Sequence, residues 1–169
     1  MDRLDRKLLV ELQRDSGRPL AAVAERVGLS LSSCHRRVKR LEAAGAIAGY
    51  GARLDARALG LELEVFVEIT LGSQSREALD AFERAVRGAD DILECKLTSG
   101  ASDYIVRVLA RGIDDYERIH RDTLARLPGV ASLQSIFTLG TVKAWRGLPV
   151  PPDAGGTAGA RDRPSRDRP

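Results

Sequence analysis

The chain has 169 residues, of which 43% are hydrophobic and 30% are charged, and its net charge is +3. These values are typical of a globular protein with one ordinary domain or two small ones. No apolar run approaches the roughly 20 residues that span a bilayer, and residues 1–9 lack the apolar core of a signal peptide. We therefore expect a cytoplasmic protein that does not enter a membrane.

The charge is unevenly distributed along the chain. Residues 1–60 carry a net charge of +5, residues 61–148 carry −3, and residues 149–169 carry +1. Only the first part is therefore expected to meet a polyanion. Cys34 and Cys95 lie far apart within apolar patterns, which predicts two free buried thiols, with no disulfide framework and no metal site.

The first 45 residues show the periodicity of three helices. Residues 5–15 predict the first helix, with leucines at positions 4, 8 and 12 on one side. Residues 19–27 predict the second, which Gly28 ends because glycine commonly terminates helices. Ser30 is suited to cap a third helix by accepting from its free N–H groups, and Gly45 ends that helix.

The third predicted helix is apolar on one side and basic on the other. Cys34, Val38 and Leu41 recur at helical spacing and are expected to face the core. A short helix pair with a basic second helix is typical of the helix-turn-helix, whose second helix enters the DNA major groove. A solvated basic surface is the alternative. The candidate DNA-contacting residues are Ser32, Ser33, His35, Arg36, Arg37, Lys39 and Arg40.

These side chains suggest different contacts with DNA. Arg36 can hold O6 and N7 of guanine, the commonest specific contact. The two serines and the histidine lie near the helix start, which sits deepest in the groove in this motif. Lys39 and Arg40 are placed to meet phosphates. Arg37 has two alternatives, a contact with DNA or an internal pair with a carboxylate.

The pattern changes in the second half of the chain. Residues 46–54 predict an extended segment and residues 55–60 a hinge. From residue 61 apolar and polar residues alternate, which is the period of a strand with one apolar face. The predicted elements are a strand at 61–71, a helix at 76–87, a strand at 92–98 with Leu93, Cys95 and Leu97 on one face, a strand at 104–110, a helix at 114–127 and a strand at 130–142. This βαββαβ order predicts a ferredoxin-like sheet with both helices on one face.

Residues 99–103 join two of these predicted strands. Gly100 allows a close approach of the backbone to a ligand, successive N–H groups can hold a carboxylate, and Asp103 can meet an α-ammonium group. The alternative is a hairpin turn in which Asp103 caps its own backbone, and the residues alone favour this turn. The candidate effector-binding residues are Ser99, Gly100, Ala101, Ser102 and Asp103, with Leu97, Phe137 and Thr138 as pocket walls or as ordinary sheet packing.

The order of these motifs resembles the Lrp/AsnC family of transcription regulators. The pattern VGLS-x-S-x-C-x-R-R-V-x-R-L-E covers residues 27–42, G-x-I-x-G-Y covers 45–50, SG-x-x-DY covers 99–104 and LPGV covers 127–130. The resemblance implies an α+β fold, with a three-helix (winged) helix-turn-helix domain at 1–54, a hinge at 55–60, and a ferredoxin-like ligand-responsive and oligomerisation (RAM) domain at 61–148. The proline-rich residues 149–169 are predicted to be a disordered tail.

The resemblance also implies a function. It implies a sequence-specific DNA-binding regulator whose oligomerisation and DNA binding respond to a small effector, usually an amino acid, and it makes residues 99–103 a ligand site. The implied partners are double-stranded DNA and further copies of the chain, as a homodimer that assembles into tetramers or octamers. No cofactor is implied.

Two rival classes remain at this stage. Siroheme decarboxylase subunits resemble this family, but such an enzyme needs positioned acid–base groups. The chain has only His35 and His120, in different predicted domains, and no nucleophile triad, metal cluster or phosphate loop. The other rival is an amino-acid-binding module without DNA binding, which the basic helix argues against.

Overall fold

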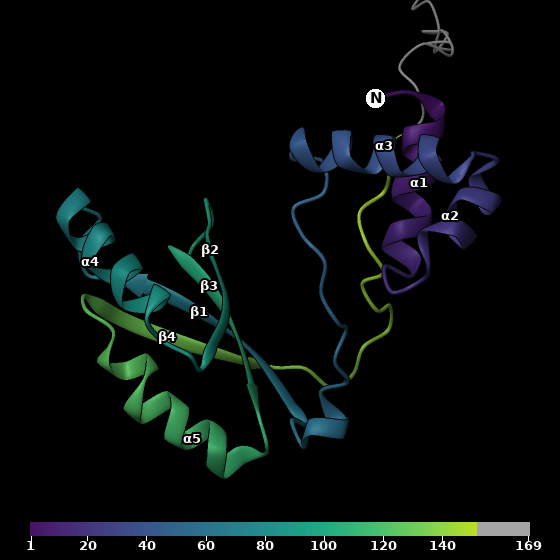
Figure 1. The fold of residues 1–169 in the computed structure, drawn as a ribbon. Coiled ribbons are helices and arrows are strands. Elements are labelled where there is room, and N and C mark those ends of the chain that lie inside the picture. Colours follow the sequence, from purple (N-terminus) through teal and green to yellow (C-terminus); the bar gives the residue numbers. More distant parts are fainter. Residues whose placement is uncertain (152–169) are drawn as a thin grey trace, which may run out of the picture. The chain divides into compact units, whose positions relative to one another are not determined.

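The computed structural model describes residues 1–151, which form two compact units (Figure 1). The first unit contains residues 1–52 and the returning segment that starts at residue 144, and the second contains residues 53–143. The predicted tail at 149–169 lies outside the described residues from residue 152 onward. No helix among the described residues is long and apolar enough to cross a membrane.

The first unit is built from the helices α1 (Arg3–Arg14), α2 (Leu20–Val27) and α3 (Leu31–Ala43). Asp2 caps α1 by accepting from the N–H of Asp5 at 2.9 Å, and the Asp5 carboxylate accepts from the N–H of Asp2 in return. This reciprocal cap starts the helix two residues before the predicted position. Gly28 ends α2 in the left-handed region with φ 73°, as predicted.

The core of the first unit consists of the side chains that were predicted to face inward. Leu8 on α1 and Val23 on α2 are almost fully buried against Cys34 and Val38 on α3. Burial of each such aliphatic side chain contributes about 1.5–3 kcal/mol. This packing fixes the rotation of α3 about its axis, so that its basic side is left toward solvent.

The segment after α3 has no strand. Residues 48–55 form neither helix nor strand, so the described residues contain no wing hairpin beside the three helices. The predicted hinge contains one turn of 3₁₀-helix, η1 (Arg57–Leu59). The carboxylate of Asp55 begins this turn by accepting from the N–H of Arg57 at 2.9 Å.

The second unit has the predicted βαββαβ order. Its elements are β1 (Leu63–Leu71), α4 (Arg76–Arg87), β2 (Ile92–Leu97), β3 (Tyr104–Ala110), α5 (Ile113–Asp122) and β4 (Val130–Phe137), with a 3₁₀ turn η2 (Leu124–Arg126) before β4. The strands form one antiparallel sheet in the order β2-β3-β1-β4. Figure 1 shows α4 and α5 on the same side of this sheet.

Both helices pack on one face of the sheet. Val67 of β1 and Val106 of β3 are fully buried together with Phe82 of α4 and Ile119 of α5. The alternate residues of the strands face away from the helices, as the period of two predicts. Among the described residues of the second unit, no helix covers the other face of the sheet.

Four sequence predictions differ from the structure in detail. The register of β2 shifts between Ile92 and Glu94, so Leu93 is 53% exposed while Ile92 packs inward. A β-bulge of this kind reverses the alternation that the sequence pattern assumes. The last strand ends at Phe137 rather than at residue 142, and the last helix breaks into α5 and η2. Cys34 is buried as predicted, but Cys95 is only half-buried.

Candidate nucleic-acid interface and effector loop

The basic side of α3 is presented by a helix that is firmly held at its start. The side-chain oxygen of Ser30 accepts from the N–H of Ser33 at 3.3 Å, the predicted cap. The candidate residues then separate by exposure: Ser32, His35, Arg36, Lys39 and Arg40 are exposed, whereas Ser33 and Arg37 are half-buried. The basic side is therefore accessible to a polyanion along most of its length.

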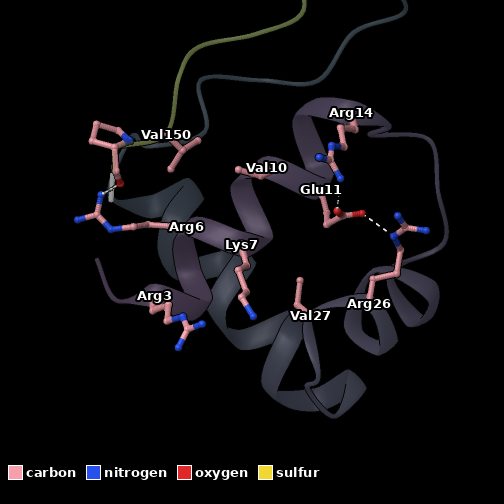
Figure 2. A pocket seen from close by; sticks show the side chains of 10 residues that line it. Arg3, Arg6, Lys7, Val10, Glu11, Arg14, Arg26, Val27 and Val150 are labelled. Carbon is pink, nitrogen blue, oxygen red and sulfur yellow. Dashed lines mark hydrogen bonds and ion pairs between the residues drawn. The ribbon is translucent and has the colours of Figure 1, made fainter. Parts of the chain in front are cut away.

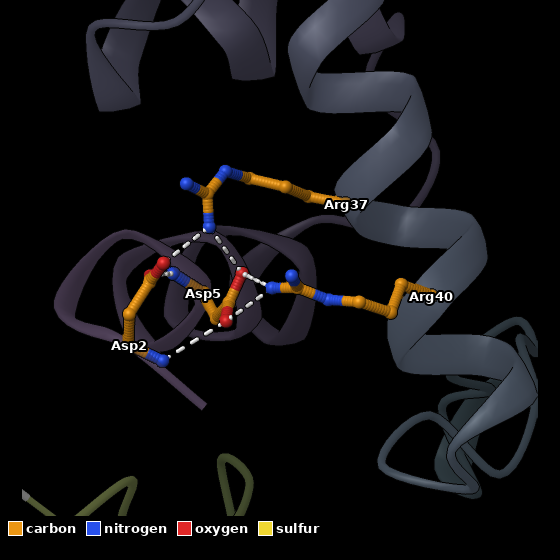
Figure 3. A network of polar contacts seen from close by, with 4 residues as sticks. All are labelled: Asp2, Asp5, Arg37 and Arg40. Carbon is orange, nitrogen blue, oxygen red and sulfur yellow. Dashed lines mark hydrogen bonds and ion pairs between the residues drawn. The ribbon is translucent and has the colours of Figure 1, made fainter.

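A buried carboxylate fastens α3 to α1 (Figure 3). Asp5 is fully buried, and it accepts from Nη1 of Arg37 at 2.7 Å and from Nη2 of Arg40 at 2.8 and 2.7 Å. Arg37 also binds Asp2 at 2.6 Å. Arg37 thus forms the internal carboxylate pair that the sequence left as an alternative. Arg40 uses part of its guanidinium in the same network.

The electrostatics of this network are strongly coupled. The hydrogen bond from Arg37 lowers the pKa of Asp2 to about 2. Burial raises the pKa of Asp5, but the N–H of Asp2 and the Arg37 guanidinium outweigh burial, and the net pKa is lowered. The same two carboxylates raise the pKa of Arg37. Asp2, Asp5 and Arg37 are therefore charged at neutral pH, and they hold one another in place.

Among the described residues, the other polar side chains on the basic side of α3 form no pair or only a surface pair. Arg36 and His35 form no hydrogen bond or ion pair with any residue between 1 and 151. Lys39 pairs with Glu42 at 2.8 Å on the surface, and the hydroxyl of Tyr50 donates to the same carboxylate at 2.9 Å. These two contacts lower the pKa of Glu42. An exposed pair such as Lys39–Glu42 contributes little and exchanges readily for a phosphate contact.

The start of α3 also has a hollow. A cavity of about 690 Å³ is lined by Leu31, Ser32 and His35. It combines an apolar side chain that is 53% exposed with a hydroxyl and an imidazole. This is the part of a recognition helix that reaches base edges, and its groups suit a thymine methyl beside hydrogen-bonding atoms.

The loop at residues 99–103 is ordered by its last residue. The Asp103 carboxylate accepts from the N–H of Leu71 at 2.8 Å and from the side-chain amide of Gln74 at 2.8 Å. The backbone of Asp103 donates to Ile69 at 2.9 Å and accepts from Thr98 at 2.8 Å. Asp103 therefore closes the end of β1 and β3 and sets the conformation of the loop. Both of its carboxylate oxygens already have a donor.

The structure brings only some of the predicted effector residues together. Leu97 is 65% exposed and pairs with Tyr104, directly beside the loop, where Ser99, Gly100 and Ala101 are exposed. Thr138 instead donates to the carbonyl of Glu64, at the opposite end of β1. Seven residues of strand separate the two ends by roughly 23 Å. Within one chain, Phe137 and Thr138 are therefore remote from the loop.

Sequence reasoning missed several residues that shape these sites. Asp2 and Asp5 precede an apolar run at a spacing of three, which is the signal of a reciprocal helix cap. Gln74 carries no motif, and its contact with Asp103 depends on the sheet register. Gln13 and Gly147 also lie outside every motif that the sequence offered, although the side chain of Gln13 binds the backbone of Leu148, the residue after Gly147.

Comparison with known proteins is consistent with this geometry. Residues 1–42 match the model of the AsnC-type helix-turn-helix domain, and residues 64–148 match the Lrp/AsnC ligand binding domain. The leucine-responsive regulatory proteins of Salmonella typhimurium and Escherichia coli are 39% identical over 143 residues, which is 85% of this chain and 87% of theirs.

Solved structures of such regulators are also similar. A transcriptional regulator of Neisseria meningitidis in complex with L-methionine has a TM-score of 0.84 at 32% identity, and covers 88% of this chain and 96% of its own. An AsnC family regulator of Agrobacterium tumefaciens has a TM-score of 0.83 at 35% identity, with coverage of 88% and 97%.

A basic recognition helix on a three-helix unit, followed by a ligand-binding ferredoxin-like unit, defines a ligand-responsive DNA-binding protein. The chain belongs to the Lrp/AsnC family of transcriptional regulators. The two solved relatives named above are transcriptional regulators.

Proposed function

We propose that the protein reads a specific DNA sequence with α3 and that a bound amino acid changes this binding. The observation that carries the first part is the exposed pair Arg36 and His35, which have no hydrogen bond or ion pair within residues 1–151. They lie on a helix whose rotation is fixed by its core and by the Asp5 network. A rigid helix with uncommitted polar side chains is what direct readout of base edges requires.

The second part concerns the loop at residues 99–103. Its exposed N–H groups suit the carboxylate of an amino acid, and Asp103 holds the loop in shape rather than standing free for the ammonium group. The Neisseria relative in complex with L-methionine supports an amino acid as the effector class. Because Phe137 and Thr138 are remote within one chain, we propose that a second copy of the chain completes the pocket.

The uncovered face of the sheet supports assembly. Phe66, Ile105 and Leu109 are half-buried on this face, and Ile136, paired with Phe66, is 43% exposed. We propose that this face pairs two chains into a dimer, and that dimers assemble further. Ile136→Glu is expected to dissociate the assembly in sedimentation, whereas Ile113→Glu on the helix side is the matched control. Equal sedimentation of both variants and the wild type would exclude this face.

The test of the function is a gel shift on the promoter of the protein's own gene. We expect a complex at nanomolar to micromolar protein that survives excess random DNA. Adding each of the twenty amino acids separately is expected to change the affinity or the stoichiometry for a few of them. A complex that random DNA removes fully would refute sequence-specific readout. An unchanged complex with all twenty amino acids would refute the amino-acid effector alone.

A tetrapyrrole-processing enzyme is the alternative that remains to be tested. His35 lies on α3 and His120 on α5, so they belong to different units. The family relatives favour the regulator. An absorption spectrum of the purified protein with added tetrapyrrole separates the two, because a bound tetrapyrrole shifts its visible bands. We also propose a cytoplasmic location, where DNA and amino acids are both available.

A further inference from the structure

The outer side of α1 holds a segment that lies more than 130 residues away along the chain. The side chain of Gln13 contacts both backbone groups of Leu148: it accepts from the N–H at 2.7 Å and donates to the carbonyl at 3.1 Å. An amide that uses its donor and its acceptor on one residue recognises extended backbone in the way a neighbouring strand does. This contact therefore holds Leu148 in one position.

Gly147 makes the contact with Gln13 sterically feasible. Its φ is 117°, a conformation that residues with a side chain rarely adopt. A Cβ atom added there would lie 2.6 Å from Oε1 of Gln13 and 3.0 Å from its Cδ. The Gln13 side chain would have to move away, and it would lose both bonds to Leu148. Glycine at position 147 therefore allows Leu148 to bind the side chain of Gln13.

The segment continues along α1 beyond Leu148. A guanidinium nitrogen of Arg6 donates to the carbonyl of Pro151. Val150, Pro151 and Val10 of α1 all line a cavity of about 660 Å³. Figure 2 shows Val150 beside Val10. Gln13, Val10 and Arg6 are spaced by three and four residues, so they form one stripe on the helix surface. The stripe follows the segment from one end to the other.

We infer that this stripe of α1 is a docking surface for residues 147–151, and that the docked segment forms a second connection between the two units. The chain leaves the first unit after residue 52 and re-enters it at residue 144. The second unit is therefore joined to the DNA-reading unit at both of its ends. Two connections restrict rotation of one unit against the other more than a single flexible linker does.

The restriction has a consequence for DNA binding, which rests on the proposed function. In an assembly, two recognition helices engage two half-sites together only if their geometry permits it. A DNA-reading unit that is joined to the second unit by two connections has fewer orientations available. The entropy lost when the second half-site binds is therefore smaller. Undocking residues 147–151 should weaken binding to paired half-sites and leave binding to a single half-site unchanged.

The chain carries its own reporter for this docking. Trp145 is the only tryptophan in the sequence and is two residues from Gly147. Time-resolved anisotropy of its emission measures local motion of the segment without any DNA. Gly147→Ala and Gln13→Ala should both shorten the anisotropy decay time of Trp145, because each variant loses the hydrogen bonds between Gln13 and Leu148. Gly140→Ala is the matched control, since a Cβ atom at Gly140 meets nothing within 4 Å.

The DNA measurement completes the experiment on the same three variants. Gly147→Ala and Gln13→Ala should bind a duplex with two half-sites about threefold to tenfold more weakly, and bind one half-site like the wild type. An anisotropy decay that neither variant changes would overturn the docking. Paired half-site affinity equal to the wild type in both variants would overturn the connection. If the wild type bound no DNA, the proposed function would fail, while the anisotropy would still test the docking.

Discussion

The two candidate sites differ in how much of each site one chain supplies. The side of α3 that we propose to read DNA is complete within the first unit: its cap, its core side chains and the Asp5 network all lie in residues 1–43. The effector loop is ordered by Asp103, but its predicted walls at Phe137 and Thr138 lie at the other end of β1. A site on one helix can be predicted from residue spacing, whereas a pocket that is shared between chains, as we propose for the effector, cannot.

The two sites also differ in what holds them. Charged groups fasten α3, because Asp5 is fully buried and meets two guanidinium groups. The loop is instead held by neutral donors, the N–H of Leu71 and the amide of Gln74. We therefore expect the loss of the Asp5 carboxylate to disturb α3 more than the loss of the Asp103 carboxylate disturbs the effector loop.

The largest effect is expected from Asp5→Ala. This change leaves the buried part of Arg37 and one side of Arg40 without their carboxylate, and it removes the reciprocal cap of α1. We expect a loss of about 2–3 kcal/mol in the free energy of unfolding, at the lower end for a broken buried pair because Arg40 is mostly exposed. Urea unfolding measures it. Asp15→Ala, which loses a surface pair with Arg18 and an exposed hydrogen bond from the N–H of Gly17, should cost less than about 1 kcal/mol.

Arg36→Ala should act on DNA binding alone. Because Arg36 has no ion pair within residues 1–151, its loss should leave the unfolding free energy unchanged. Binding to the operator should weaken by about 1–3 kcal/mol, with relaxed preference at one base pair. Lys39→Ala is the comparison, since a phosphate contact should weaken binding to all sequences and flatten its salt dependence. Operator and random DNA bound by both variants as by the wild type would refute this side of α3 as the interface.

The sequence predicted the elements well where one periodicity sufficed. The inward faces of α1, α2 and α3 and the alternation of β1 follow directly from the positions of their apolar residues. The sequence prediction is wrong at Leu93, where a bulge changes the alternation, and at the end of β4, where the strand stops at Phe137. Thr138 still donates to the carbonyl of Glu64, but residues 138–142 form no strand. Both depend on neighbouring strands, which a single stretch of sequence does not specify.

The candidate sites were likewise predictable where local spacing determines them and unpredictable where tertiary contacts do. Arg37 was assigned two alternatives because the sequence shows that it lies on a basic helix, but not that Asp2 and Asp5 face it. The docking of Leu148 on Gln13 joins residues 135 positions apart, with no motif at either end. Contacts that depend on tertiary packing become predictable only once the fold is known.

Asp103→Ala should have a smaller effect than Asp5→Ala. The N–H of the buried Leu71 loses its acceptor, which costs about 1–2 kcal/mol in the free energy of unfolding. The loop should also lose its fixed shape, so the amino acid that raises the melting temperature of the wild type should raise it less in the variant. Asp103→Asn keeps one acceptor oxygen, so both its free energy of unfolding and its melting shift with the amino acid should lie between those of Asp103→Ala and the wild type. A variant that melts and binds the effector like the wild type would show that Asp103 does not order the loop.

The smallest expected effect is the loss of stability at acidic pH when the Asp2 carboxylate is protonated. The pKa of Asp2 is lowered from 3.8 to about 2 in the folded protein by its bond to Arg37. A lowered folded-state pKa means that the unfolded chain takes up the proton first, so this contribution to stability is present above about pH 4 and is lost as the pH falls toward 2.

Asp2→Asn should therefore differ most from the wild type near neutral pH in urea unfolding, and the free energies of unfolding of the two proteins should converge below pH 3. Glu77→Gln, an exposed carboxylate in the first turn of α4, is the control for general acid effects. A constant difference between Asp2→Asn and the wild type from pH 7 to pH 2 would show that the Arg37 pair does not set this pKa.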